Sequence, residues 1–275
     1  MGSAATGCGG LLTETERSLR AHGRVVLCQI VRAEGSTPGK VGWKLLARPD
    51  GTFAGNLGGG AFEAMVKADA QAKLLHDGGS EVKRYYLTEQ AVKGEATGMV
   101  CGGMAEVFLE VMEAVPVLVI CGGGPVGQAL AGGGALAGFE LLVADDRDEF
   151  RRPELFPAGT GLAEVGRGYE QDFLAPIRAR DLFVAVVSRC WETDAAALAA
   201  VLRQAPPRLR YLGLMGSRRK VAKVGEELAA RGFDLASIPR FHAPIGLPIG
   251  GDSPGEIAVS ILAEVIATRY ETTAV

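Results

Sequence analysis

Paired cysteines are the first feature that this sequence lacks. Its five cysteines (Cys8, Cys28, Cys101, Cys121 and Cys190) are scattered, and no two form a Cys-x-x-Cys pair. This pattern argues against a disulfide framework or a zinc site, and it indicates a reducing compartment. Only three histidines are present, and no Ser-His-Asp arrangement, histidine cluster or P-loop motif stands out.

Long apolar runs and a strong charge of one sign are also missing. The most apolar run, "VPVLVIC", has the length of a strand and falls well short of the roughly 20 residues that a membrane-spanning helix needs. The first ten residues have no charged start or apolar core of a signal peptide. A net charge of -3 gives no electrostatic reason to bind nucleic acid or a membrane surface. We therefore expect a cytoplasmic protein with a flexible tail over residues 1–12.

What the chain has in plenty is glycine, with 39 in 275 residues, and apolar residues, which make up 48%. This composition is typical of a globular α/β protein with many tight loops. Residues 13–113 mix strand-like runs with two helical segments, and Asp50-Gly51 predicts a hairpin turn. In the second helical segment, one face carries Phe62, Met65, Val66, Ala70 and Leu74. We predict a smaller α+β domain over 13–113.

Residues 114–275 follow a different pattern, in which apolar strands alternate with helices. The strand candidates are "VLVIC", "ELLVADD", "DLFVAVVS" and "YLGLMG", and such unbroken runs are typical of strands buried on both faces of a parallel sheet. The alternation indicates βαβ units. The last helix begins with Ser253 and Pro254, and Glu256 completes a capping box.

A Gly-x-Gly-x-x-Gly turn (Gly122, Gly124, Gly127) joins the first of these strands to a helix. In a Rossmann-like fold such a turn brings backbone amides to a pyrophosphate, and an acid at the end of the next strand binds ribose hydroxyls. Asp145 and Asp146 stand at that place. Asp145 favours an NAD-type ribose, and Arg147 beside it weakens that preference. The alternative is a Rossmann-like fold whose glycine turn binds nothing. The predicted fold class is α/β, with a C-terminal Rossmann-like parallel sheet covered by helices on both faces.

Other candidate ligand-binding residues follow strand ends or open helices. Ser217 is a predicted N-cap, and Arg218, Arg219 and Lys220 place cations in the first helical turn, where a bound anion would relieve their conflict with the helix dipole. A solvated basic turn explains the same residues. His242 lies in a loop near the strand ends. It either contacts a ligand or is a loop histidine whose hydrogen bonds are satisfied within the chain.

The N-terminal domain has its own glycine-rich segments. Gly58, Gly59 and Gly60 open a helix and could form a backbone nest for an anion. Glu63, in the first turn of that helix, either acts at a site or complements the dipole. Cys101 precedes two glycines, so that a ligand could approach its thiol, although most lone cysteines are small core residues.

Taken together, these motifs resemble the XdhC/CoxI family, the xanthine dehydrogenase accessory factors. The resemblance extends from about Val25 to Ala267, through "GSTPGKVG", "GNLGGGAFE", "VCGGMAEVF", "VICGGGPVGQALA", "VADDR", "GLMGSRRKV" and "HAPIGLPIG…SPGEIAVSILAE". Individually these motifs are weak, and their shared order is specific. The chain departs from the family at Gly39, Ala61, Pro125 and Cys190-Trp191, which suggests an altered ligand environment or a different client enzyme.

The resemblance implies an accessory chaperone more than an enzyme. Such a protein would bind the molybdenum cofactor, as molybdopterin or its cytosine dinucleotide, protect it, and pass it to an apo molybdenum hydroxylase of the xanthine dehydrogenase type. A cysteine desulfurase is a further implied partner. Cys101 then becomes a candidate for ligating molybdenum or handling sulfur, and the glycine segments become candidates for holding the cofactor phosphate.

Two alternatives use the Rossmann-like domain differently. One is an NAD(P)-dependent oxidoreductase. The sequence argues against it, because the N-terminal half has no evident acid/base residue or substrate pocket. The other is a nucleotide-sensing protein without chemistry. The apolar C-terminal helix, for example over Ile257–Ile266, could bury itself within the chain or in a homodimer.

Overall fold

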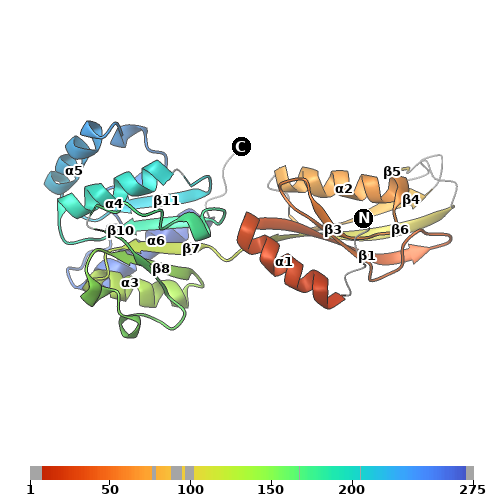
Figure 1. Ribbon diagram of the computed structural model, residues 1–275, viewed down its shortest axis with the longest axis horizontal. Coiled ribbons are helices and arrows are strands. Elements are labelled where there is room, and N and C mark those ends of the chain that lie inside the picture. The colour runs from red at the N-terminus through yellow and green to blue at the C-terminus, as the bar shows by residue number, and fades with distance from the viewer. Residues whose placement is uncertain are drawn as a thin grey trace. The chain divides into compact units, whose positions relative to one another are not determined.

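The computed structural model describes residues 8–75, 79–87, 95–96, 102–166, 168–204 and 206–270. The chain divides after Ala114 into two compact units, each with its own six-stranded sheet (Figure 1).

The first unit is built on a sheet with the strand order β3-β2-β1-β6-β4-β5. Its pairs are antiparallel except for β4 and β5, which run parallel. The predicted hairpin joins β2 to β3 through Asp50-Gly51. The strands are β1 (Arg24–Glu34), β2 (Lys44–Ala47), β3 (Phe53–Gly55), β4 (Glu81–Leu87), β5 (Glu95–Ala96) and β6 (Gly103–Glu113).

Two helices pack on this sheet. The helix α2 (Gly60–Leu75) buries Phe62, Val66 and Ala70, as its periodicity predicts, and covers one face of the sheet (Figure 1). The helix α1 (Cys8–His22) begins earlier than expected, so the predicted tail over 1–12 is wrong for residues 8–12. Leu11 explains the difference, because it packs with Val25 beneath the other face and is only 5% exposed.

The second unit has a fully parallel sheet with the order β12-β11-β10-β7-β8-β9. The four predicted strands are present, and two short ones, β9 and β12, were not expected. The strands are β7 (Val117–Cys121), β8 (Glu140–Asp145), β9 (Gly161–Glu164), β10 (Leu182–Val186), β11 (Leu209–Leu214) and β12 (Phe241–His242).

Helices cover both faces of this sheet (Figure 1). On one face lie α3 (Pro125–Leu136) and α6 (Pro254–Tyr270), and on the other lie α4 (Trp191–Gln204) and α5 (Arg218–Ala230). The predicted capping box starts α6, since Ser253 N donates to Glu256 Oε2 at 3.0 Å and Glu256 N donates to Ser253 Oγ at 3.3 Å. This arrangement confirms the predicted Rossmann-like fold class.

The strand order creates a switch point between β7 and β10. The chain runs outward from β7 to β8 and β9, and then returns to the other side of β7 as β10. Ligands of open α/β sheets bind outside the carboxyl ends of the strands at such a point. Across the part of the chain that is described, no helix combines the length and apolarity needed to cross a bilayer.

Candidate functional site

The glycine turn occupies the switch point, between β7 and α3. Gly122 has a φ of +124°, and a Cβ there would lie 2.8 Å from the carbonyl oxygen of Val187. A Cβ on Gly127 would stand 1.9 Å from the carbonyl oxygen of Gly122. A Cβ on Gly124 would have no atom within 4 Å beyond the adjoining backbone. Two of the glycines therefore allow close packing of the turn, and the middle one leaves it open.

The helix α3 begins without a side-chain cap. Gly124 is the N-cap in an extended conformation, Pro125 follows, and no side chain accepts a hydrogen bond at this terminus. The amides of Val126 and Gly127 have no acceptor within the helix, and the aligned peptide dipoles add positive potential there. An uncapped helix start beside an open glycine suits an anionic phosphate.

Asp145 closes the turn on its far side. Its Oδ1 accepts from the backbone N and the Nε of Arg147, each at 3.0 Å. Its Oδ2 accepts from Gly123 N at 2.8 Å and from Arg147 Nη2 at 3.0 Å. Burial alone would raise the pKa of Asp145, but these hydrogen bonds from Arg147 and Gly123 hold the pKa below its usual range. All the accepting positions of this carboxylate are therefore taken, and the predicted grip on ribose hydroxyls would require Arg147 to leave.

Two arginines lie over the paired acids at the end of β8. Arg147 stacks on the ring of Phe150, with its Cζ 3.9 Å from the ring centroid. Arg189, just after β10, binds both oxygens of Asp146, at 2.9 and 3.1 Å. Sequence reasoning missed Arg189, because the sheet order that brings it to Asp146 cannot be read from a local motif.

The predicted basic turn at the start of α5 splits into two parts. Ser217 caps the helix by accepting from Lys220 N at 3.3 Å, as predicted, and Arg218 and Arg219 are exposed. The Lys220 side chain turns inward, and its Nζ lies 2.5 Å from Asp194 Oδ2. Binding of an anion by the two arginines therefore stays a prediction. The ammonium of Lys220, in contrast, already has a carboxylate partner.

Asp194 is the most deeply buried charge in this region, with no exposed surface. Its Oδ1 accepts from Ser188 Oγ at 2.5 Å. Burial raises the pKa of Asp194 above its usual value, although the hydrogen bonds from Lys220 and Ser188 act in the opposite direction. The network ties the starts of α4 and α5 together below the carboxyl ends of β10 and β11.

His242 belongs to a second polar network, on β12. Its Nδ1 lies 3.1 Å from Glu264 Oε1, and its ring stacks on Tyr211 at a centroid distance of 4.5 Å. Tyr211 Oη donates to Glu264 Oε2 at 2.5 Å, and Gly246 N donates to the same oxygen at 2.8 Å. His242 is thus held in place by its own chain, and it lies on the short strand β12 and not in the expected loop.

In the first unit, the glycine-rich segments singled out from the sequence meet at one end of the sheet. A Cβ on Gly39 would overlap the carbonyl oxygen of Leu57, and one on Gly58 would overlap the backbone of Pro38. Ser36 forms an isolated β-bridge with Gly102. Three segments that are far apart in the sequence therefore pack backbone against backbone. Cys101 precedes this junction and lies outside the described residues.

Glu63 organises the glycine loop at the start of α2. Its Oε2 accepts from Leu57 N at 2.9 Å and from Gly59 N at 3.1 Å, and Lys67 Nζ binds Oε1 at 2.7 Å. Burial would raise the pKa of Glu63, but these hydrogen bonds from Lys67 and the two amides lower it. Glu63 therefore acts in this loop as a cap. A Cβ on Gly59 would meet no atom within 4 Å, but Gly59 N donates to Glu63 and Gly58 N donates to Asn56 Oδ1, so two amides of the predicted anion nest are already taken by the chain itself.

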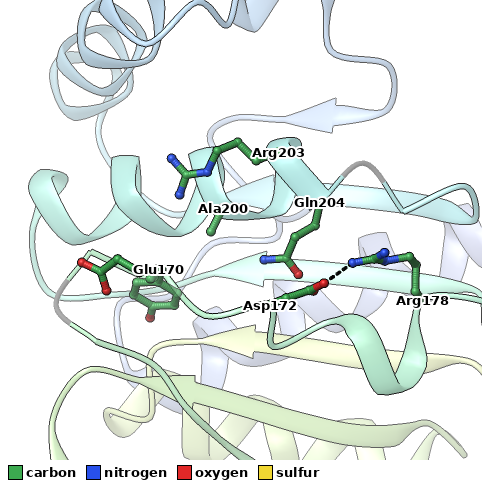
Figure 2. A pocket seen from close by; sticks show the side chains of 7 residues that line it. Glu170, Asp172, Arg178, Ala200, Arg203 and Gln204 are labelled. Atoms are coloured by element: carbon green, nitrogen blue, oxygen red, sulfur yellow. Dashed lines mark hydrogen bonds and ion pairs between the residues drawn. The ribbon is translucent and has the colours of Figure 1, made fainter.

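Figure 2 shows a separate polar pocket at the opposite end of α4 from the glycine turn. It has a volume of about 280 Å³ and contains no residue predicted from the sequence. Asp172 and Arg178 form an ion pair on one side, and Glu170 lies on the other (Figure 2). Within the described ranges, no group of three or more His, Cys, Asp or Glu side chains could hold a metal ion.

The cysteines whose side chains are described differ in burial, since Cys28 and Cys121 are buried and Cys190 is partly exposed. Burial raises the pKa of Cys28 to about 12, with a smaller contribution from Asp69, and burial likewise raises the pKa of Cys121. Because the thiolate is the reacting form, we expect Cys190 to be alkylated at least ~1000-fold faster than the two buried thiols.

This expectation can be checked by mass spectrometry of maleimide-treated protein carrying Cys8→Ser and Cys101→Ser. Cys28 and Cys121 should react only after unfolding in urea. Equal labelling of the three thiols in folded protein would contradict the assignment of their burial.

Two family models match the chain. One, described as the XdhC Rossmann domain, covers residues 118–265. The other, described as the XdhC and CoxI family, covers residues 18–86. The first spans the whole glycine turn, the acids at the end of β8 and the polar network around His242.

Curated relatives and solved structures are also similar. An uncharacterized protein, YqeB of Escherichia coli, is 34% identical over 94% of this chain and 46% of its own. A protein of Bacillus subtilis, described as a probable subunit of xanthine dehydrogenase, is 31% identical over 59% of this chain and 46% of its own. The chain thus spans slightly less than half the length of both. A crystal structure of a xanthine dehydrogenase from Bacillus halodurans, 21% identical, covers 96% of this chain and 97% of its own with a TM-score of 0.49.

Proposed function

Because this chain belongs to the XdhC and CoxI family, we propose that it is an accessory protein of a xanthine dehydrogenase-type molybdenum hydroxylase. In this role it binds the molybdenum cofactor, protects it and helps to insert it into the apo-hydroxylase. A cysteine desulfurase is a further proposed partner, and the protein itself acts as a chaperone in the cytoplasm.

The observation that supports this proposal most is the open glycine turn of the second unit. Gly124 leaves space beside it, and α3 starts there without a side-chain cap. The cofactor is an anionic pterin phosphate, so its phosphate fits uncapped amides at a helix start. Gly124 and the amides of Val126 and Gly127 would hold that phosphate, with Gly122 shaping the turn that positions them. The cofactor brings the redox-active metal of the hydroxylase, and the residues of this chain supply the grip on its phosphate.

The test is a pair of measurements on the purified full chain. We expect molybdopterin, or its cytosine dinucleotide, to bind saturably in a fluorescence titration, and the loaded protein to activate an apo-hydroxylase in vitro. NAD is the comparison ligand, because the alternative oxidoreductase predicts tight NAD binding and turnover. Failure of both cofactor binding and activation, with circular dichroism showing folded protein, would reject the proposal.

A further inference from the structure

The end of β8 is built differently from a site for a ribose diol. A free carboxylate is needed at this place to accept hydrogen bonds from two hydroxyls. Each oxygen of Asp145 already accepts two hydrogen bonds from the chain, from Gly123 and Arg147. The group left to meet a ligand is therefore the guanidinium and not the acid.

Exposure separates the charges at this edge. The side chains of Asp145 and Asp146 are 2% and 6% exposed, whereas those of Arg147 and Arg189 are 25% and 46% exposed. The acids thus lie beneath their arginines, and in each ion pair the more exposed group is the guanidinium. Asp148, which is 92% exposed, pairs with Arg151.

The two arginines are close to one another and to the glycine turn. Asp146 Oδ1 lies 2.9 Å from Arg189 Nη1 and 4.0 Å from Arg147 Nε. Asp145 Oδ2 accepts from both Gly123 N and Arg147 Nη2, within 3.0 Å of each. The turn amide and the guanidinium therefore meet at one oxygen atom, which places the cation directly beside the predicted phosphate cradle.

Arg147 also has donors to spare. A guanidinium carries five N–H groups, and Asp145 takes those on Nε and one on Nη2. Among the described residues, Nη1 has no hydrogen-bond partner. The stacking on Phe150 and the bidentate bond to Asp145 hold the guanidinium in one orientation. A ligand that binds it would therefore cost little further conformational entropy of the Arg147 side chain.

We propose that the end of β8 is a phosphate subsite, in which Arg147, with Arg189 beside it, binds a phosphomonoester of the ligand whose main phosphate lies at the glycine turn. Guanidinium groups bind phosphate through charge-assisted hydrogen bonds, and an arginine near this strand end is the usual partner of a ribose 2′-phosphate. The inference rests on the proposed function only in taking the glycine turn to be a phosphate site.

The probes are 5′-AMP and 2′,5′-ADP, which differ by one phosphomonoester. In calorimetric titrations of the full chain, we expect 2′,5′-ADP to bind about tenfold more tightly or better, as expected for a hydrogen bond to a charged group. Arg147→Ala should reduce this preference to less than about threefold, and Arg147→Lys should leave an intermediate preference because the charge remains. Arg189→Ala, at a more exposed position, should lower the preference several-fold and provides a second test independent of the bond to Asp145.

Arg231→Ala is the matched control. It removes the same charge from the C-terminal end of α5, where Arg231 pairs with Glu227, and should leave the preference unchanged. The proposal is overturned if wild-type protein binds neither nucleotide, if it binds both equally, or if the preference survives in both Arg147→Ala and Arg189→Ala. Molybdopterin should displace 2′,5′-ADP. If it does not, the cofactor function fails while the phosphate subsite stands.

Discussion

Gly127→Ala is expected to lower the free energy of unfolding of the second unit by about 2 kcal/mol or more. The added Cβ would stand 1.9 Å from the carbonyl oxygen of Gly122 and 3.3 Å from Ile120 Cγ2. The first of these atoms belongs to the backbone, so α3 must move away from β7 to accept it. Alanine gains about 1 kcal/mol of helix propensity over glycine, and the steric cost outweighs that gain.

The same substitution five residues further along the helix, at Gly132, gives the opposite sign. A Cβ on Gly132 meets no atom within 4 Å other than the adjoining backbone of α3. Gly132→Ala should therefore stabilise the unit by about 0.5–1 kcal/mol through helix propensity alone. Urea unfolding followed by the fluorescence of Trp191, in protein carrying Trp43→Phe, isolates the second unit. A Gly127→Ala variant as stable as Gly132→Ala would contradict the close packing.

Gly124→Ala separates ligand binding from folding at the same turn. Its backbone is compatible with alanine, since φ is −67°, and the loss of a glycine N-cap costs about 1 kcal/mol or less. The new methyl group would stand in the open space beside the start of α3. Binding of 2′,5′-ADP should then weaken while the stability stays close to that of the wild type.

The glycine turn shows how far the sequence predicts this site. The strand, the three glycines and the helix were sufficient to predict the turn, because their roles depend on local backbone geometry. The sequence also predicted the acid at the end of β8. Whether Asp145 is free to bind a ligand depends on Arg147 and on the amide of Gly123, and these hydrogen bonds form only when the loop folds over the turn.

Partners that come from distant strands were not predictable in this way. Arg189 reaches Asp146 because β10 returns beside β7, and Glu264 reaches His242 because α6 packs across β11. Asp194 carried a local signal, since it is an acid that opens the alanine-rich stretch of α4. Its lysine partner was predicted for another role, because a cation in the first turn of a helix suggests an external anion.

Lys220→Met is expected to cost about 3 kcal/mol of stability, since it leaves the carboxylate of Asp194 buried without its counter-ion. Asp194 has no exposed surface, and Lys220 Nζ lies 2.5 Å from it. Ser188 would keep its hydrogen bond to the other oxygen, but a hydroxyl replaces only part of the interaction with an ammonium group. The double variant Asp194→Asn with Lys220→Met removes both charges and should recover a substantial part of the loss.

The pH dependence gives this prediction a definite sign. Burial raises the pKa of Asp194 above its ordinary value of 3.8, so the folded protein binds this proton more tightly than the unfolded chain does. Stability from this group is therefore greater below the folded pKa and falls as the pH rises through it. Without Lys220 the carboxyl would hold its proton still more tightly, and protonation would relieve the unpaired charge. The deficit of Lys220→Met should thus be smaller at about pH 5 than at about pH 7.5.

Urea unfolding of the four proteins of this cycle, at both pH values and with Trp191 as the probe, measures the coupling between the two side chains. The stability of Asp194→Asn itself should lack the pH dependence that Asp194 contributes to the wild-type protein, because the variant has no carboxyl to titrate at this position. Lys223→Met is the matched control, since that lysine stacks on Trp191 at 4.0 Å near the same helix start without facing Asp194. A deficit of Lys220→Met that is equal at the two pH values, or a double variant as unstable as the sum of the single ones, would show that Asp194 does not depend on Lys220 for its charge. A large coupling that shrinks in acid would identify the pair as the element that fixes α5 against α4 at the carboxyl ends of β10 and β11.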